Sequence, residues 1–137
     1  MPTGTGTNLF GLWQGFVYFR ELGFIDRLPR LFAVQPTGAA SLVAAWEASQ
    51  DIPATLEQVE PNAAPPISHR VSGYHAYRAM QESGGGAVAV SDDEMLAALR
   101  DLASHEGIYA ETASAAALAG IRRARALGLL SEEESHQ

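Results

Sequence analysis

The chain has 137 residues, 47% of them hydrophobic, and its 16 acidic and nine basic residues give a formal net charge of -7. The acidic balance argues against nucleic-acid binding, and no apolar run is long enough to span a bilayer, so we expect a cytoplasmic protein without a membrane partner. Cysteine is absent, which excludes disulfides and thiolate nucleophiles, and the four histidines lack the spacing of a metal site.

The first half of the chain predicts two helices and a buried strand. Apolar residues recur at three- and four-residue steps over residues 9–22, which is typical of an amphipathic helix packed on a core. The apolar run 31–34 lies between two prolines and predicts a strand, and residues 38–49 predict a second helix. The proline-rich stretch 51–66 predicts a loop with a short strand at 56–59.

The second half predicts three further helices, over 73–83, 91–105 and 113–127, and two short strands, over 87–90 and 108–110. Ser91 and Glu94 have the spacing of a capping box at the start of the second of these helices. Strands alternating with helices predict an α/β fold, a partial doubly wound and mostly parallel sheet whose ligands bind beyond the carboxyl ends of the strands. Residues 1–130 form the predicted domain, and residues 131–137 a polar tail.

The strongest candidate site is the run Gly4-Thr5-Gly6-Thr7-Asn8, directly before the first predicted helix. Its glycines permit close backbone approach, its threonines add hydroxyl donors, and a helix start offers unpaired amides, so the run is suited to a phosphate group. It matches neither the dinucleotide fingerprint nor the P-loop, which needs a lysine. A simple turn capped by Asn8 is an equally good interpretation.

Two further segments contain candidate residues. Small residues around the start of the last helix leave room for a flat ligand, which Glu111 and Ser114 could orient, although helix capping by these two residues is the favoured interpretation. In the polar turn 68–73, Arg70 could pair with an anion, but a surface position is favoured. We interpret the aromatic residues of the first two helices, Phe10, Trp13, Phe16 and Trp46, as core.

The order of the motifs resembles the carboxyl-terminal half of threonine synthases. The matching runs are Gly4-Thr5-Gly6-Thr7-Asn8, Trp13-Gln14-Gly15-Phe16, Ile25-Asp26-Arg27-Leu28-Pro29-Arg30, Glu82-Ser83-Gly84-Gly85 and Ser114-Ala115-Ala116-Ala117-Leu118-Ala119-Gly120. The resemblance implies a fold-type-II pyridoxal-phosphate enzyme, a lyase that converts O-phosphohomoserine to threonine and phosphate. It implies that Gly4 to Asn8 hold the cofactor phosphate, that Glu111 and Ser114 lie on the cofactor side, and that residues 1–130 belong to the large domain.

The sequence departs from this family in one decisive respect, because all nine basic residues are arginine and the chain has no lysine. The family attaches its cofactor to a lysine, so no catalytic residue is expected in this chain. We therefore expect a fragment of an enzyme that acts on a small amino-acid substrate, inactive alone and self-associating through exposed surface; in a split-enzyme variant of this interpretation, a second polypeptide supplies the lysine. The alternatives are a serine or threonine dehydratase and a non-catalytic anion-binding or assembly module.

Overall fold

A computed structural model describes residues 1–130, and the predicted polar tail at residues 131–137 lies outside this range. The helices are α1 (Thr7–Glu21), α2 (Ser41–Glu47), α3 (Tyr74–Glu82), α4 (Asp92–Glu106) and α5 (Thr112–Ala126); the strands are β1 (Phe32–Pro36) and β2 (Gly86–Val90); η1 (Thr37–Ala39) and η2 (Pro65–Ile67) are single 3₁₀ turns. The predicted helices and the strands at 31–34 and 87–90 are confirmed to within a few residues. Within residues 1–130, no helix is both long and apolar enough to cross a membrane.

The sheet is parallel, as the alternation of elements predicts. Strands β1 and β2 pair from Phe32 with Gly86 to Pro36 with Val90. The first three residues extend the sheet at the other side of β1, because the Thr3 amide donates to the Val34 carbonyl and the Val34 amide donates to the Met1 carbonyl, each at 2.8 Å. The Gly4 to Asn8 loop therefore begins directly after this third, strand-like segment.

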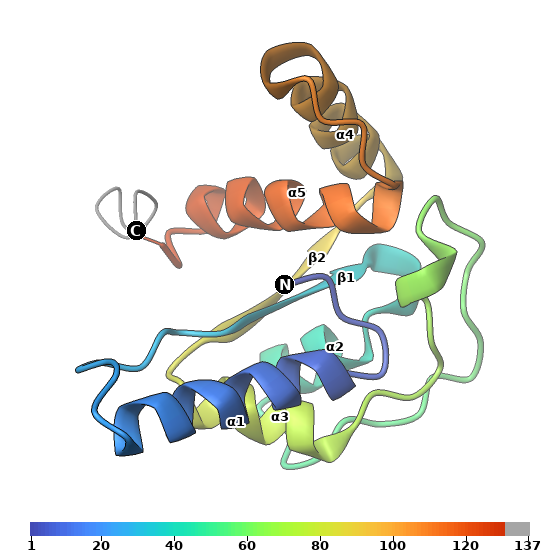
Figure 1. Cartoon of the computed structure of the whole chain (residues 1–137). Helices are drawn as coiled ribbons and strands as arrows, with labels where there is room; N and C mark the ends of the chain where they lie inside the picture. Colours follow the sequence, from blue (N-terminus) through green and yellow to red (C-terminus); the bar gives the residue numbers. More distant parts are fainter. Residues whose placement is uncertain (131–137) are drawn as a thin grey trace.

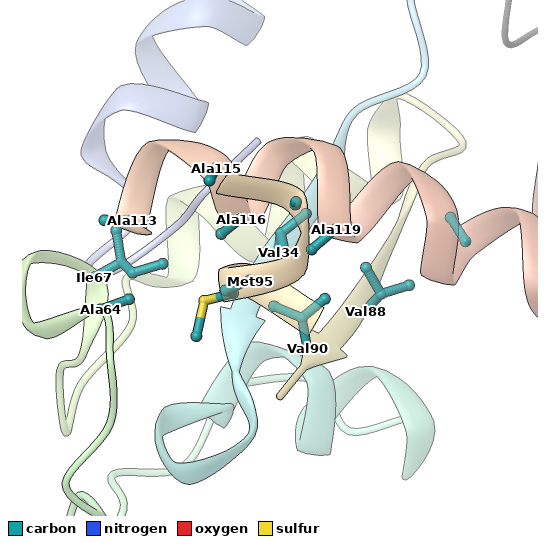
Figure 2. Close-up of a cluster of buried hydrophobic side chains, with 12 residues drawn as sticks. Val34, Ala64, Ile67, Val88, Val90, Met95, Ala113, Ala115, Ala116 and Ala119 are labelled. Atoms are coloured by element: carbon teal, nitrogen blue, oxygen red, sulfur yellow. The ribbon is translucent and has the colours of Figure 1, made fainter. Parts of the chain in front are cut away.

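Helices cover the sheet on both faces, with α5 on one face and α1, α2 and α3 on the other, while α4 packs on the outside of α5 (Figure 1). The core between α5 and the sheet consists of small residues on the helix and branched residues on the strands, such as Ala116, Ala119, Val34 and Val88 (Figure 2). Because Ala113, Ala115 and Ala116 are buried in this core, the small residues at the start of α5 serve close packing.

Two predicted strands do not form. Residues 56–59 make only an isolated backbone contact, in which the Leu56 amide donates to the Arg70 carbonyl at 2.9 Å. Residues 108–110 connect α4 to α5, and the side chains of Ile108 and Tyr109 are 55% and 86% exposed. Within residues 1–130 neither run has a neighbouring strand to satisfy its backbone groups, so both remain irregular. The sheet thus has fewer strands than predicted.

The apolar stripe of α1 is only half buried. Leu9 and Trp13 lie in the core against α3, whereas Leu12 is 47% exposed and Phe19 is 51% exposed, contrary to the expected packing. The other aromatic residues expected in the core, Phe10, Phe16 and Trp46, are partly buried. Since periodicity indicates which residues share a face but not how much of that face is covered, α1 presents apolar side chains to solvent.

The predicted capping box at the start of α4 is present. The Glu94 amide donates to Ser91 Oγ at 3.2 Å, and the Ser91 amide donates to Glu94 Oε2 at 2.7 Å. Replacing Ser91 by alanine should lower the free energy of unfolding by about 1 kcal/mol, measured by urea denaturation. Ser91→Asp keeps a capping oxygen and should restore most of this loss; equal losses in both variants would show that the cap contributes nothing.

Candidate functional site

A cavity of about 150 Å³ opens at the carboxyl edge of the sheet, between the chain start and the segment around η2. All five residues of the predicted phosphate loop, Gly4 to Asn8, line it together, and Pro66, Ile67 and His69 form the opposite wall. The cavity lies where the alternation of strands and helices places a ligand, beyond the carboxyl ends of parallel strands.

Both glycines of the loop are required by its geometry. A Cβ on Gly4 would collide with the His69 ring and lie 3.3 Å from Ile67 Cα. Gly6 has φ +91°, in the left-handed region, and a Cβ there would collide with Ala76 Cβ. Gly6 is also the N-cap of α1 and makes no side-chain cap, so the interpretation of a turn capped by Asn8 is wrong.

The loop presents unpaired donors to the cavity. Within residues 1–130, the amides of Thr5, Gly6, Thr7 and Asn8 donate no backbone hydrogen bond outside the regular helix, and the first turn of a helix has no internal acceptors for its amides. The hydroxyls of Thr5 and Thr7 lie 3.4 Å apart and are exposed. Burial lowers the pKa of the Met1 amino group to about 6, so attraction for an anion here comes mainly from amides and the helix dipole.

A second loop, formed by Ser72 and Gly73, donates hydrogen bonds to backbone carbonyls of the first loop. Ser72 Oγ donates to the Gly4 carbonyl at 3.0 Å, and the Gly73 amide donates to the Thr5 carbonyl at 2.7 Å. The buried side chains of Gln35 and Ser41 in turn bond Ser72 Oγ. Sequence reasoning missed this network, although a glutamine directly after the apolar run 31–34 is a signal for a buried polar contact.

Other candidate residues lie outside the cavity. Arg70, in the same turn as Ser72, is exposed and its Nε donates to the Leu56 carbonyl, in agreement with a surface position. Glu111 is the N-cap residue of α5 but its side chain makes no capping bond, and Ser114 lies inside the helix, so the favoured interpretation of both side chains as caps is wrong. Neither residue lines the cavity at Gly4 to Asn8.

The residues present fit a phosphate ester in this cavity. Five residues of the glycine-rich loop line it, and the amides at the start of α1 and the exposed Thr5 and Thr7 hydroxyls supply donors. An amine to attach an aldehyde cofactor is a separate requirement, and the sequence contains no lysine to meet it. In residues 1–130, no group of three or more potential metal ligands comes together.

The chain is similar to known pyridoxal-phosphate enzymes over nearly its whole length. A family model described as "Pyridoxal-phosphate dependent enzyme" matches residues 1–135. The threonine synthase of Methanosarcina acetivorans is 36% identical over 138 aligned residues, which cover 98% of this chain and 34% of that protein. The threonine synthase of Mycobacterium bovis is 38% identical over 124 residues, covering 90% and 32%. The chain thus spans about a third of the length of these relatives.

Solved structures show the same fold. The processed form of threonine deaminase isoform 2 from Solanum lycopersicum superposes with a TM-score of 0.71 at 22% identity, covering 94% of this chain and 35% of that chain. Serine racemase from Dictyostelium discoideum superposes with a TM-score of 0.61 at 22% identity, covering 87% and 34%. At such low identity these likenesses establish the architecture alone.

Proposed function

Since the chain belongs to the pyridoxal-phosphate-dependent enzyme family and has its α/β fold, we propose that residues 4–8 hold the cofactor phosphate in a threonine-synthase-like catalytic centre. The observation that supports this role most strongly is the cavity formed by a glycine-rich loop, unpaired amides and the positive end of α1. Identities of 36% and 38% to threonine synthases favour conversion of O-phosphohomoserine to threonine and phosphate as the reaction of the complete centre.

The loop residues have distinct roles in this proposal. Gly4 and Gly6 let the loop pack closely on His69 and Ala76, the amides at the start of α1 donate to the phosphate oxygens, and the neighbouring Thr5 and Thr7 hydroxyls add donor capacity. When bound, pyridoxal phosphate supplies an electron sink for carbanion chemistry. Glu111 and Ser114 remain candidates for the cofactor side only if the complete centre extends over the exposed start of α5.

Because the chain has no lysine, residues outside it must supply the amine that attaches the cofactor. We propose that a second polypeptide supplies the lysine and the contacts to the amino-acid substrate, and that the 137 residues alone do not turn over substrate. The chain would then act as one component of a split enzyme.

The exposed apolar side chains at the end of α1 form a suitable docking surface for such a polypeptide. This α1 surface comprises Leu12, Phe19, Leu22 and Phe24, which are 47%, 51%, 68% and 72% exposed. Among residues 1–130, strand β2 also has no strand on its outer edge. An exposed apolar patch and an open sheet edge each favour association, and in the absence of the lysine-bearing polypeptide we expect the chain to self-associate.

Complementation tests the proposed function. The partner is the Methanosarcina acetivorans threonine synthase from which the segment matching this chain has been deleted, and release of phosphate from O-phosphohomoserine is measured. Neither polypeptide should be active alone, whereas the mixture should turn over. The same mixture made with the Phe19→Asp variant should lose activity because a charge is placed in the α1 surface.

The outcomes separate the alternatives. Turnover by this chain alone would refute the requirement for an external lysine. A mixture that forms a complex by analytical ultracentrifugation but releases no phosphate would refute the threonine-synthase-like centre. Ammonia release from serine or threonine by that mixture would identify the dehydratase alternative, and a complex with neither activity would favour the non-catalytic binding module.

A further inference from the structure

We propose that Ser72 is a positioning residue that orients the phosphate-binding amides of Thr5 and Gly6, an inference that rests on the proposed role of the loop. Ser72 lies outside the predicted phosphate loop and 5% of its surface is exposed, so it acts through the backbone behind the cavity. It joins that backbone to Gln35 on β1 and Ser41 on α2.

The orientation follows from the planarity of the peptide bond. In a trans peptide unit the carbonyl and the next amide point in opposite directions, and the described residues contain no cis peptide. Ser72 Oγ binds the Gly4 carbonyl and the Gly73 amide binds the Thr5 carbonyl. The two amides that follow, those of Thr5 and Gly6, are therefore held pointing away from the 72–73 loop.

The Ser72 hydroxyl has no freedom to change partners. Its oxygen accepts from Gln35 Nε2 at 3.1 Å and from Ser41 Oγ at 2.7 Å, and its proton goes to the Gly4 carbonyl at 3.0 Å. A hydroxyl has one proton and two lone pairs, so all three are used. Gln35 Oε1 accepts from the Leu42 amide at 2.8 Å, which fixes the glutamine as well.

The network therefore connects the rigid part of the fold to the loop. Gln35 and Ser41 are 1% and 2% exposed, and buried polar groups that are fully hydrogen-bonded favour a single arrangement. Replacing Ser72 by alanine frees the Gly4 carbonyl and leaves Gln35 Nε2 and Ser41 Oγ without their acceptor. The peptide plane before Thr5 can then rotate, and the amides no longer converge on one phosphate.

Two measurements on the full chain test this proposal, with Ser83→Ala as matched control. Ser83 Oγ accepts from the Leu31 amide and donates to the Met80 carbonyl, each at 3.0 Å, at the opposite end of α3 from Gly73. NMR relaxation gives the order parameters of the Thr5 and Gly6 amides without ligand. Calorimetry gives the affinity for pyridoxine 5′-phosphate and for pyridoxine, which lacks the phosphate.

We expect the order parameters of Thr5 and Gly6 to fall from about 0.85 to below about 0.6 in Ser72→Ala, and to stay high in Ser83→Ala. Affinity for pyridoxine 5′-phosphate should weaken about tenfold in Ser72→Ala alone, and affinity for pyridoxine should change less than about twofold in either variant. Ser41→Ala removes one donor to Ser72 without touching the loop, and should lower the same order parameters even if Ser72→Ala fails to fold.

Unchanged order parameters in both Ser72→Ala and Ser41→Ala, or equal changes in Ser83→Ala, would overturn the positioning role. If the unaltered chain binds pyridoxine and its 5′-phosphate equally well, the proposed function of the loop fails instead. The order parameters still decide in that case whether Ser72 holds the two amides.

Discussion

The Gly6→Ala variant should be less stable by about 2–4 kcal/mol and should lose its preference for a phosphate-bearing ligand. Gly6 has φ +91°, which costs a residue with a side chain about 1–2 kcal/mol, and the new Cβ would also collide with Ala76 Cβ on α3. The collision pushes the start of α1 away from α3. The amides of the loop then no longer meet at one point, and a phosphate loses several donors at once.

Gly107→Ala is the matched control for this prediction. Gly107 also has a positive φ, +66°, but a Cβ there meets nothing within 4 Å. The Gly107→Ala variant should lose only about 1–2 kcal/mol of unfolding free energy, the cost of the backbone conformation, and its ligand affinity should be unchanged. Urea denaturation and calorimetry of the two variants separate the effects. Equal destabilisation of both would show that the contact with Ala76 does not matter.

The Gly120→Val variant should lower the free energy of unfolding by about 3 kcal/mol, because α5 packs on β1 without room for a side chain. A Cβ at Gly120 would overlap the Val34 side chain, one branch of which would lie only 2.9 Å away. Both residues border the core between α5 and the sheet, so neither can move into solvent. The helix must shift outward, and the contacts of its alanines with the strands are lost.

Gly15→Val is the matched control because Gly15 is also in a helix interior, and a Cβ there meets nothing within 4 Å. Valine has a slightly better helix propensity than glycine, so this variant should change stability by less than about 0.5 kcal/mol. The double variant Gly120→Val with Val34→Ala should be less destabilised than the sum of its parts. Simple additivity, measured by urea denaturation, would contradict a direct contact.

The helices and central strands could be predicted from the sequence because their signals are local. The capping residues Ser91 and Glu94 and the three-residue steps of the apolar positions mark helix starts and faces without knowledge of the rest of the fold. The strands expected at 56–59 and 108–110 do not form, because runs this short carry no reliable periodic signal. A strand also requires a hydrogen-bonding neighbour, which depends on the whole topology.

The candidate site was predictable in part for the same reason. The loop Gly4 to Asn8 is contiguous, so its glycines and hydroxyls could be recognised together before the first helix. Its support by Ser72 and Gln35 joins residues 37 positions apart in the chain, and no local pattern predicts such a contact. Glu111 and Ser114 matched a family motif, yet in the chain as described they are exposed and do not line the cavity.

We infer that this chain holds the phosphate of its cofactor without attaching the cofactor covalently. The most direct test is the thermal stability of the intact chain in the presence of pyridoxine 5′-phosphate, which keeps the ring and phosphate but has no aldehyde to react with an amine. A ligand that binds only the native state at 100 times its Kd adds about 2.7 kcal/mol of stability. We predict that the melting temperature rises with pyridoxine 5′-phosphate and not with pyridoxine. Equal shifts, or no shift with either compound, would contradict the account.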